Sequence, residues 1–240
     1  MEIVVVDSGS QDETLDIARR AADLLIEIPP SAYTPGHALN VGAAAAAGEV
    51  VGALSSHCEL ASDIWAEHAL AHFADPAVGA TTGSLHGPDG PLSTPVRQTA
   101  ELARQHPQWG FSNHASAWRA TTWARMPFDE SLPTGEDRKW ALGVLEGGEA
   151  IVFDPKLWVE MSHRWKQGAM TFFRRERLEQ RVIWSLYGLP APGALDLLGE
   201  WWRPPDTRHS PLFHRLNPRR AAGLLGAHLG RRAGAAHRPG

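Results

Sequence analysis

The sequence predicts an α/β protein, built on an open and mainly parallel β-sheet with helices on both faces. Short continuous apolar runs, such as "IVVV" at residues 3–6, are typical of strands that are buried on both faces. Segments with helical spacing of apolar residues follow these runs, and such strand–helix alternation is typical of parallel sheets. Ligands of these sheets bind beyond the carboxyl ends of the strands, so the residues that follow each strand are the first candidates for a site.

The first half of the chain alternates regularly. After "IVVV" comes "DSGSQDET", where Ser10 and Glu13 have the spacing of a capping box and predict a helix that runs to about Leu25. "PSAYTPGH" is predicted as a loop because of its proline and glycine. The remaining elements are predicted as strands at 26–29, 50–54 and 78–83 and as helices at 38–48 and 62–73.

The second half is less regular. Residues 84–112 are rich in loop-forming residues and carry one predicted helix near 95–104. A short helix is predicted for "SNHASAWRATTWARM", and a further helix is expected to open at Asp137 and to end at Gly147–Gly148. Two strands, "AIVFDP" and "LWVEMSH", and a helix at 167–187 with an apolar face complete the pattern.

Composition and charge set the broad class. The 240 residues are 43% hydrophobic and 21% charged, and no stretch has the length of a membrane span. Cys58 is the only cysteine, so no internal disulfide can form, which fits a cytoplasmic protein. From Arg203 onward eight arginines stand against one acid. This segment is either a solvated extension or a basic patch for an anionic partner such as a lipid headgroup.

The composition and length predict two regions. Residues 1–188 are expected to form the α/β domain. Residues 189–240, rich in Pro, Gly and Arg, are expected to form a looser extension. The high Ala, Arg, Gly and Pro content suggests a GC-rich bacterial gene.

Four polar positions follow predicted strands or open a predicted helix, and each has a structural explanation. Asp7 can cap the next helix, and His57 can be a hydrogen-bonded structural histidine. The pair Glu136–Asp137 suits the positive end of a helix dipole, and His163 can lie on the surface. Taken singly, none of them identifies a function.

Four segments in this order change the interpretation: "EIVVVDSGSQDETLDIA", "PGHALNVGAAAAAGEVVGALSSHC", "FSNHASAWRATTWARMPFDESLPTGEDRKWA" and "AIVFDP…VEMSHRW". Together they resemble family 2 glycosyltransferases of the GT-A fold over roughly residues 2–175. The Ser-Ser-His-Cys segment at 55–58 resembles the branch found among capsule and O-antigen transferases, where a similar segment replaces the usual acidic metal motif. The resemblance implies an inverting transferase that uses a nucleotide-diphosphate-sugar donor and a divalent metal, Mn²⁺ or Mg²⁺. It also implies that residues 1–188 are the catalytic domain, with a nucleotide-binding half at about 1–83 and an acceptor half at about 84–188. Polysaccharide or natural-product glycosylation is the expected setting.

The resemblance also implies donor-binding residues. Asp7, with Ser8 and Gly9, matches the position that contacts the base or ribose of the nucleotide, and Asn40 matches the segment near the donor diphosphate. Ser56 and His57 stand where the acidic metal motif is expected. Three roles of His57 stay open: a ligand of a transition ion, a hydrogen-bond donor to the diphosphate, or a structural residue.

The acceptor side is implied in the same way. Asp137 matches the base that takes the proton from the acceptor hydroxyl, and Glu136 the residue that positions it or contacts the acceptor. His163 matches a late histidine that reaches the metal or diphosphate. Trp140 and Trp165 are candidates for stacking on sugar faces, although tryptophans at such spacing are usually core residues.

Two departures from the family pattern stand out. The strand and "P-T-Y-N"-like segment that normally precede "EIVVVD" are absent, which predicts an unpaired sheet edge, and His37 stands where an arginine is common. The missing strand and the absent acidic metal motif favour an alternative, a non-catalytic GT-A-like subunit that binds nucleotide sugar. The intact Glu136–Asp137 pair and His163 argue against it. A nucleotidyltransferase is weaker, because "DSGSQDET" has no basic residue.

The expected partners are a nucleotide-sugar donor and an acceptor that is a glycan, a lipid-linked sugar or a small molecule. No nucleic acid is expected. A cytoplasmic protein is expected. If the arginine-rich tail is a basic patch rather than a solvated extension, it predicts contact with the inner face of the cell membrane.

Overall fold

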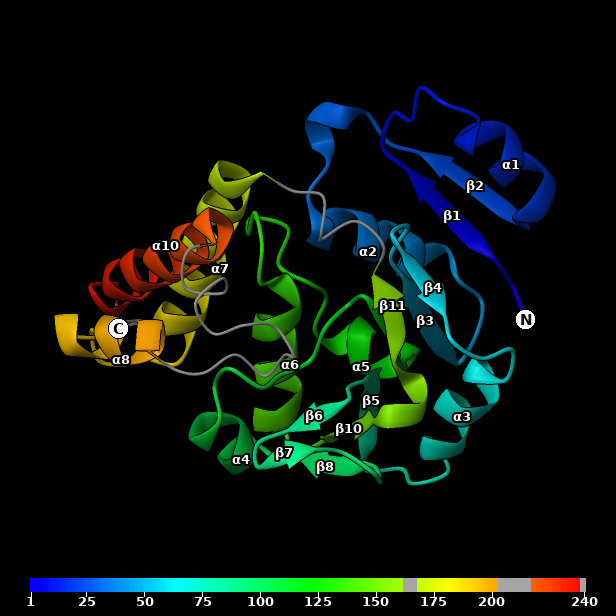
Figure 1. Cartoon of the computed structure of the whole chain (residues 1–240). Coiled ribbons are helices and arrows are strands. Elements are labelled where there is room, and N and C mark those ends of the chain that lie inside the picture. The colour runs from blue at the N-terminus through cyan, green and yellow to red at the C-terminus, as the bar shows by residue number, and fades with distance from the viewer. Residues whose placement is uncertain (162–167, 203–216, 238–240) are drawn as a thin grey trace. The chain divides into compact units, whose positions relative to one another are not determined.

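The structure, a computed structural model, describes residues 1–161, 168–202 and 217–237 (Figure 1). The chain forms two compact units, Met1–Ser162 and His163–Gly240. Each unit is described by itself below.

The first unit contains a five-stranded sheet with the strand order β3-β9-β5-β10-β8. These strands are β3 (Val50–Leu54), β9 (Ala115–Arg119), β5 (Val78–Gly83), β10 (Ala150–Asp154) and β8 (Val96–Gln98). β5 and β10 pair in parallel, and every other neighbouring pair in this sheet is antiparallel. The α/β class is therefore confirmed, but the expectation of mainly parallel pairing was wrong, because β9 lies between β3 and β5 and runs against both.

The strand β9 occupies the segment for which the sequence predicted a helix. Only the second half of that segment is helical, as α5 (Ala120–Arg125). β9 pairs with β3 along one edge and with β5 along the other, so tertiary pairing prevails over the helix propensity of its alanines. A strand from the second half of the chain thus separates two strands of the first half, and the sheet does not divide at residue 83.

A second, two-stranded parallel sheet is formed by β1 (Val4–Asp7) and β2 (Leu24–Glu27). In the part of the chain that the structure describes, β1 pairs only with β2, and β3 pairs only with β9. The predicted capping box does not form: α1 (Thr14–Ala21) has no side-chain cap, and the Ser10 hydroxyl donates instead to Asp7.

The other described elements of the first unit range from two residues to the eleven residues of α2 and α6. They are η1 (Pro30–Ala32), α2 (Pro35–Ala45), β4 (Cys58–Leu60), α3 (Trp65–His72), β6 (His86–Gly87), β7 (Gly90–Pro91), α4 (Ala100–Gln105), α6 (Glu136–Glu146), η2 (Pro155–Leu157) and β11 (Val159–Met161). β4 and β11 pair in an antiparallel ribbon.

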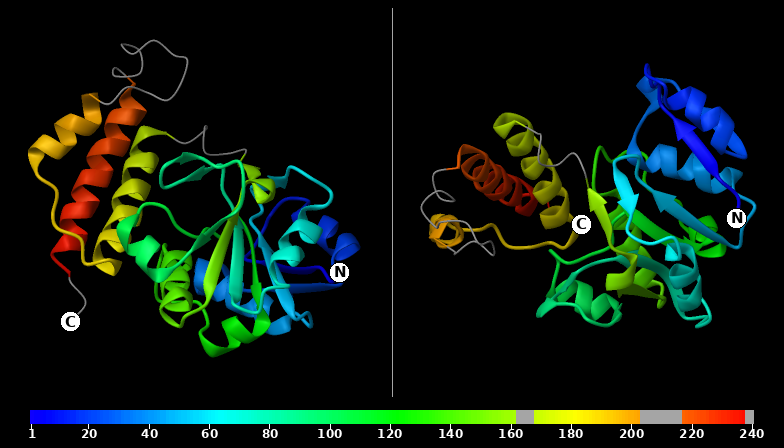
Figure 2. Two further views of the ribbon diagram at one scale, coloured as in Figure 1. Left: turned by 90° about the horizontal axis from the view of Figure 1, so that it is seen from below. Right: turned by 45° about the vertical axis from the view of Figure 1, so that its right-hand side comes forward.

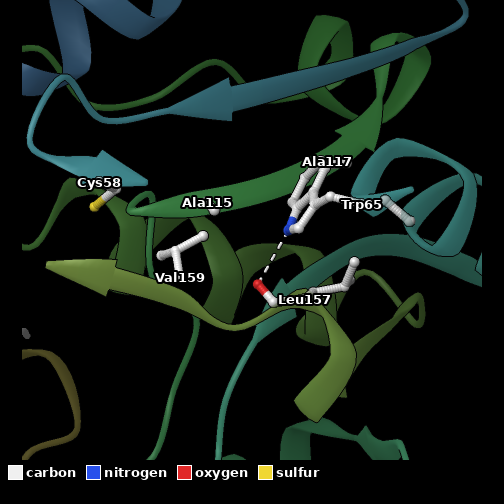
Figure 3. Packing of buried hydrophobic residues seen from close by; sticks show 7 residues of the cluster. Cys58, Trp65, Ala115, Ala117, Leu157 and Val159 are labelled. Atoms are coloured by element: carbon white, nitrogen blue, oxygen red, sulfur yellow. Dashed lines mark hydrogen bonds between the residues drawn. The ribbon is translucent and has the colours of Figure 1, made fainter. Parts of the chain in front are cut away.

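A compact apolar cluster lies under the β4–β11 ribbon (Figure 3). Cys58 and Val159 contribute from the two strands of the ribbon, and Ala115 and Ala117 from β9. The Trp65 indole donates to the Leu157 carbonyl at 3.0 Å, which ties α3 to η2. Cys58 is 8% exposed, so it anchors the chain directly after His57.

The second unit consists of α7 (Ala169–Leu186), α8 (Ala194–Trp202) and α10 (Pro218–Ala235), which lie side by side with α10 in the middle (Figure 2). The predicted boundary at residue 188 was therefore wrong, because α7 packs on α10. Glycines make this contact close: a Cβ on Gly226 would lie 2.4 Å from the Phe173 carbonyl oxygen, and one on Gly230 2.2 Å from that of Arg177. None of the helices in the described ranges is long and apolar enough to cross a bilayer.

Candidate functional site

The carboxyl end of β3 leads directly into a tight turn that presents His57. The Cys58 amide donates to the Ser55 carbonyl at 2.9 Å, which closes the turn. Ser56 is exposed and His57 is half-buried. Because buried Cys58 fixes one end of the turn and β3 the other, the His57 ring is held at the sheet edge where α/β proteins bind ligands.

A second histidine, His114, lies against His57. Its carbonyl accepts from the Ser55 amide at 2.9 Å, which extends the β3–β9 pairing beyond the end of β3. The two rings meet edge to face, with centroids 5.4 Å apart. The Ser112 hydroxyl bonds Nδ1 of His114 and fixes the ring. Sequence reasoning missed His114, since only the antiparallel register of β9 on β3 brings the two histidines together.

The first turn of α6 carries the predicted catalytic pair. Gly135 precedes the helix with a left-handed φ of 77°, and Glu136 and Asp137 follow, where the helix dipole favours negative charge. Glu136 is 6% exposed and accepts from the Asn113 side-chain amide at 3.2 Å. Asp137 is half-buried and accepts from the Arg138 amide. Asn113 is the neighbour of His114, so one segment joins the histidine pair to the carboxylate pair.

The Asp7 carboxylate is bound within its own loop. It accepts from the amides of Gly9 and Ser10 and from the Ser10 hydroxyl. These bonds, the side-chain bond from Ser10 foremost, lower the pKa of Asp7, which is 6% exposed. Ser8 is half-buried and Gly9 is exposed at a left-handed φ of 99°. The loop therefore keeps an ionised carboxylate at the end of β1.

Asn40 lies in α2 and fastens that helix to the segment before α6. Its amide nitrogen donates to the Phe128 carbonyl and to Glu130, both at 2.9 Å. Its oxygen accepts from the Trp123 indole and from the Phe128 amide, also at 2.9 Å. Both donors and both lone pairs are thus in use within the protein. His37, one turn earlier, pairs with Glu130 at 2.8 Å.

We expect Asn40→Ala to lower the free energy of unfolding by about 2–3 kcal/mol, because it leaves the Trp123 indole and the Phe128 amide without acceptors. Urea denaturation measures this. The matched control is Asn217→Ala, which removes one exposed helix cap and is expected to cost about 1 kcal/mol. Equal losses for both variants would contradict the fastening role.

Asp129, in the segment before α6, makes the stability of the folded protein depend on pH. Its bond from the Lys139 ammonium, with further bonds from Ser131, lowers its pKa from 3.8 to about 2. Since the folded-state pKa is depressed, the stabilisation is present above about pH 4 and is lost as the pH falls toward 2. The Asp129 and Lys139 side chains are 27% and 51% exposed, so water screens the pair and we expect only about 1 kcal/mol.

Asp129→Asn is therefore expected to destabilise the protein by about 1 kcal/mol at neutral pH and by progressively less as the pH drops below 4. Chemical denaturation of both proteins across this range measures the difference. A destabilisation that stays constant down to pH 2 would show that the carboxylate charge is not the cause.

Trp140 belongs to the core rather than to an acceptor site, as its neighbours make clear. It is 2% exposed, stacks on Phe128 with centroids 5.0 Å apart, and donates to the Met126 carbonyl at 2.7 Å. No sugar can reach its ring, so the expected stacking role was wrong. His163 and Trp165, predicted for the diphosphate and the acceptor, lie outside the described residues.

The donor set around His57 allows a partial test of metal binding. Within the described ranges, no group of three or more His, Cys, Asp or Glu side chains is gathered as a metal site would require. Two imidazoles suit a transition ion such as Mn²⁺ better than Mg²⁺, which prefers oxygen, and they would need further ligands from a bound substrate. The residues present therefore fit a metal site whose ligands come partly from the protein and partly from the substrate, better than a site formed by the protein alone.

The chain was compared with protein families, curated proteins and solved structures. The model of "Glycosyl transferase family 2" matches residues 1–128, just over half of the chain. No curated protein matches the sequence. Among solved structures, the mannosyltransferase PcManGT from Pyrobaculum calidifontis, in complex with GDP-Man and Mn²⁺, is 19% identical with a TM-score of 0.57, covering 98% of this chain and 64% of its own.

Two further structures are similar. S. aureus TarS 1-349 is 19% identical with a TM-score of 0.54, over 93% of this chain and 61% of its own. Glucosyl-3-phosphoglycerate synthase from Mycobacterium tuberculosis, in complex with Mn²⁺, UDP and glucosyl-3-phosphoglycerate, is 17% identical with a TM-score of 0.59, over 80% and 71%. At these identities the likeness supports the fold alone, and the chain spans less than two thirds of the first two structures.

Proposed function

Because the chain belongs to glycosyl transferase family 2 and has the GT-A fold, we propose that it moves a sugar, with inversion, from a nucleotide-diphosphate donor to an acceptor hydroxyl. The observation that carries this proposal is that one short segment, Asn113–His114, contacts both the carboxylate pair of α6 and His57. Asn113 bonds Glu136 at the start of α6, and its neighbour His114 packs on His57 at the end of β3. A diphosphate at the histidines would therefore have carboxylates close by.

The difference in burial supports different roles for the two carboxylates. Glu136 is almost fully buried and held by Asn113, so it acts as a positioning residue. Asp137 is more exposed and is the base. It takes the proton of the acceptor hydroxyl while that oxygen forms a bond to the anomeric carbon. The bond from this carbon to the diphosphate breaks, and the nucleoside diphosphate leaves with the electron pair. A single displacement of this kind inverts the anomeric centre.

His57 acts on the leaving group. It either donates to a diphosphate oxygen or, together with His114, binds a divalent ion, which would stabilise the negative charge on the leaving diphosphate. Mn²⁺ accompanies the nucleotide or nucleotide sugar in two of the similar structures. Asp7 is proposed to contact the nucleoside, since its ionised carboxylate lies at the end of β1. Ser8, Gly9 and Ser56 are proposed to lie along the donor.

The test is release of nucleoside diphosphate from a panel of UDP-, dTDP-, GDP- and CDP-sugars, with a mixture of glycan and lipid-linked acceptors. We expect release from one donor class to rise when acceptor is added, and NMR coupling constants of the product to report the inverted anomer. Binding of a donor with no release under any condition would overturn the transferase and favour the non-catalytic subunit.

A further inference from the structure

The two units carry opposite charge. Residues 163–240 contain 14 Lys and Arg against 5 Asp and Glu, whereas the whole chain has a net charge of −4. The first unit is therefore strongly acidic and the second strongly basic. An anionic surface would on balance repel the first unit and attract the second, so electrostatics favours contact through the second unit.

The helix α8 exposes an apolar face. Leu195, Leu198 and Trp202 recur at the spacing of one helical face, and they are 81%, 53% and 60% exposed. The C-terminal end of α8 is attached to α10: Arg220 donates to the main-chain carbonyls of Glu200 and Trp201, and Arg231 pairs with the Glu200 carboxylate. The polar bonds thus hold α8 with its large apolar side chains turned outward.

The helix α7 exposes a basic face in the same unit. Arg174, Arg177 and Arg181 are exposed and recur at helical spacing, with Met170 and Leu178 beside them. Within the described part of the chain, these three arginines make no ion pair, unlike Arg175, which pairs with Glu179. Their charges are therefore available to an external anion.

We propose that the second unit binds an anionic lipid bilayer, with the outer face of α8 inserted among the lipids and the arginines of α7 adding electrostatic attraction. Exposed leucine and tryptophan beside an excess of arginine fit the boundary between headgroups and acyl chains. A nucleic acid or another polyanion would use the arginines but would leave the apolar face of α8 in water, so the combination favours lipid.

Vesicle co-sedimentation of the full chain tests the proposal. We expect binding to vesicles that contain phosphatidylglycerol, weak binding to pure phosphatidylcholine, and release as salt is raised. The triple variant Leu195→Ser, Leu198→Ser, Trp202→Ser should lower the partition coefficient at least about tenfold. Arg174→Gln, Arg177→Gln, Arg181→Gln should lower it about tenfold or more, only on anionic vesicles.

The matched control replaces three similarly exposed apolar residues of the first unit, Ile17, Ile64 and Leu70, by serine and should leave binding unchanged. If the α8 triple variant fails to fold, Leu195→Ser alone, the most exposed of the three, still has to weaken binding. The proposal is overturned if wild-type protein ignores anionic vesicles or if the α8 variants bind like wild type.

Two other outcomes would also overturn it. A dimer in analytical ultracentrifugation that the α8 variant abolishes, without any vesicle binding, would assign this face to a second copy of the chain. Binding to polyphosphate or nucleic acid that depends on the α7 arginines but not on α8, again without vesicle binding, would assign the surface to a polyanion.

Discussion

Asp137→Asn is expected to lower kcat by about 10²–10⁴-fold, the usual contribution of a general base, while leaving the affinity for nucleoside diphosphate nearly unchanged. The amide keeps the size of the side chain and can still accept from the Arg138 amide, but it cannot take the acceptor proton. Rates of nucleoside diphosphate release at saturating donor, with titration calorimetry for affinity, measure the two quantities separately.

The neighbouring carboxylate and a distant one complete this test. Glu136→Gln should reduce kcat less than Asp137→Asn, because an amide can still hold Asn113 through its oxygen. Asp89→Asn, in the exposed hairpin of β6 and β7, is the control and should behave like wild type. Equal loss of turnover and of nucleotide affinity in Asp137→Asn would contradict its assignment as the base.

His57→Ala is expected to weaken the productive donor complex by about 10–100-fold, because a hydrogen bond or ligand bond to a charged diphosphate is lost. The form of the loss separates its two proposed roles. If His57 binds a metal ion, the concentration of Mn²⁺ needed for half-maximal activity rises. If it donates to the diphosphate, donor affinity falls equally with Mn²⁺ and with EDTA.

His114→Ala should reproduce the His57 effect in part, since the two rings are in contact. His86→Ala is the matched control, because His86 is exposed in β6, which belongs to a different sheet from β3 and β9. If His57→Ala leaves donor affinity and the response to metal unchanged, the histidine has only a structural role.

Local sequence patterns were sufficient for much of the first unit. β3 and β5 lie where their apolar runs predicted, and α6 starts within one residue of the predicted position because Glu136 and Asp137 follow a left-handed glycine. These elements are defined by local signals, namely continuous apolar runs and helix-terminal residues, that need no knowledge of distant partners.

Contacts between segments far apart in the sequence explain why β9, His114 and α10 were not predicted. β9 is a strand because β3 and β5 flank it, and no local signal reveals such neighbours. The same pairing brings His114 to His57, so the missed strand and the missed histidine share one cause. α10 was missed because its glycines suggested loose structure, whereas they allow close packing against α7.

The central claim, a nucleotide-diphosphate-sugar site at the end of β3, is tested most directly by thermal shift of the full chain with UDP, dTDP, GDP and CDP. Each nucleotide is measured with Mn²⁺, with Mg²⁺ and with EDTA, for wild type and for His57→Ala. A ligand that binds only the folded state raises the unfolding midpoint. We expect one nucleotide to raise it in wild type and to raise it clearly less in His57→Ala. No shift with any nucleotide, or an equal shift in both proteins, would contradict the claim.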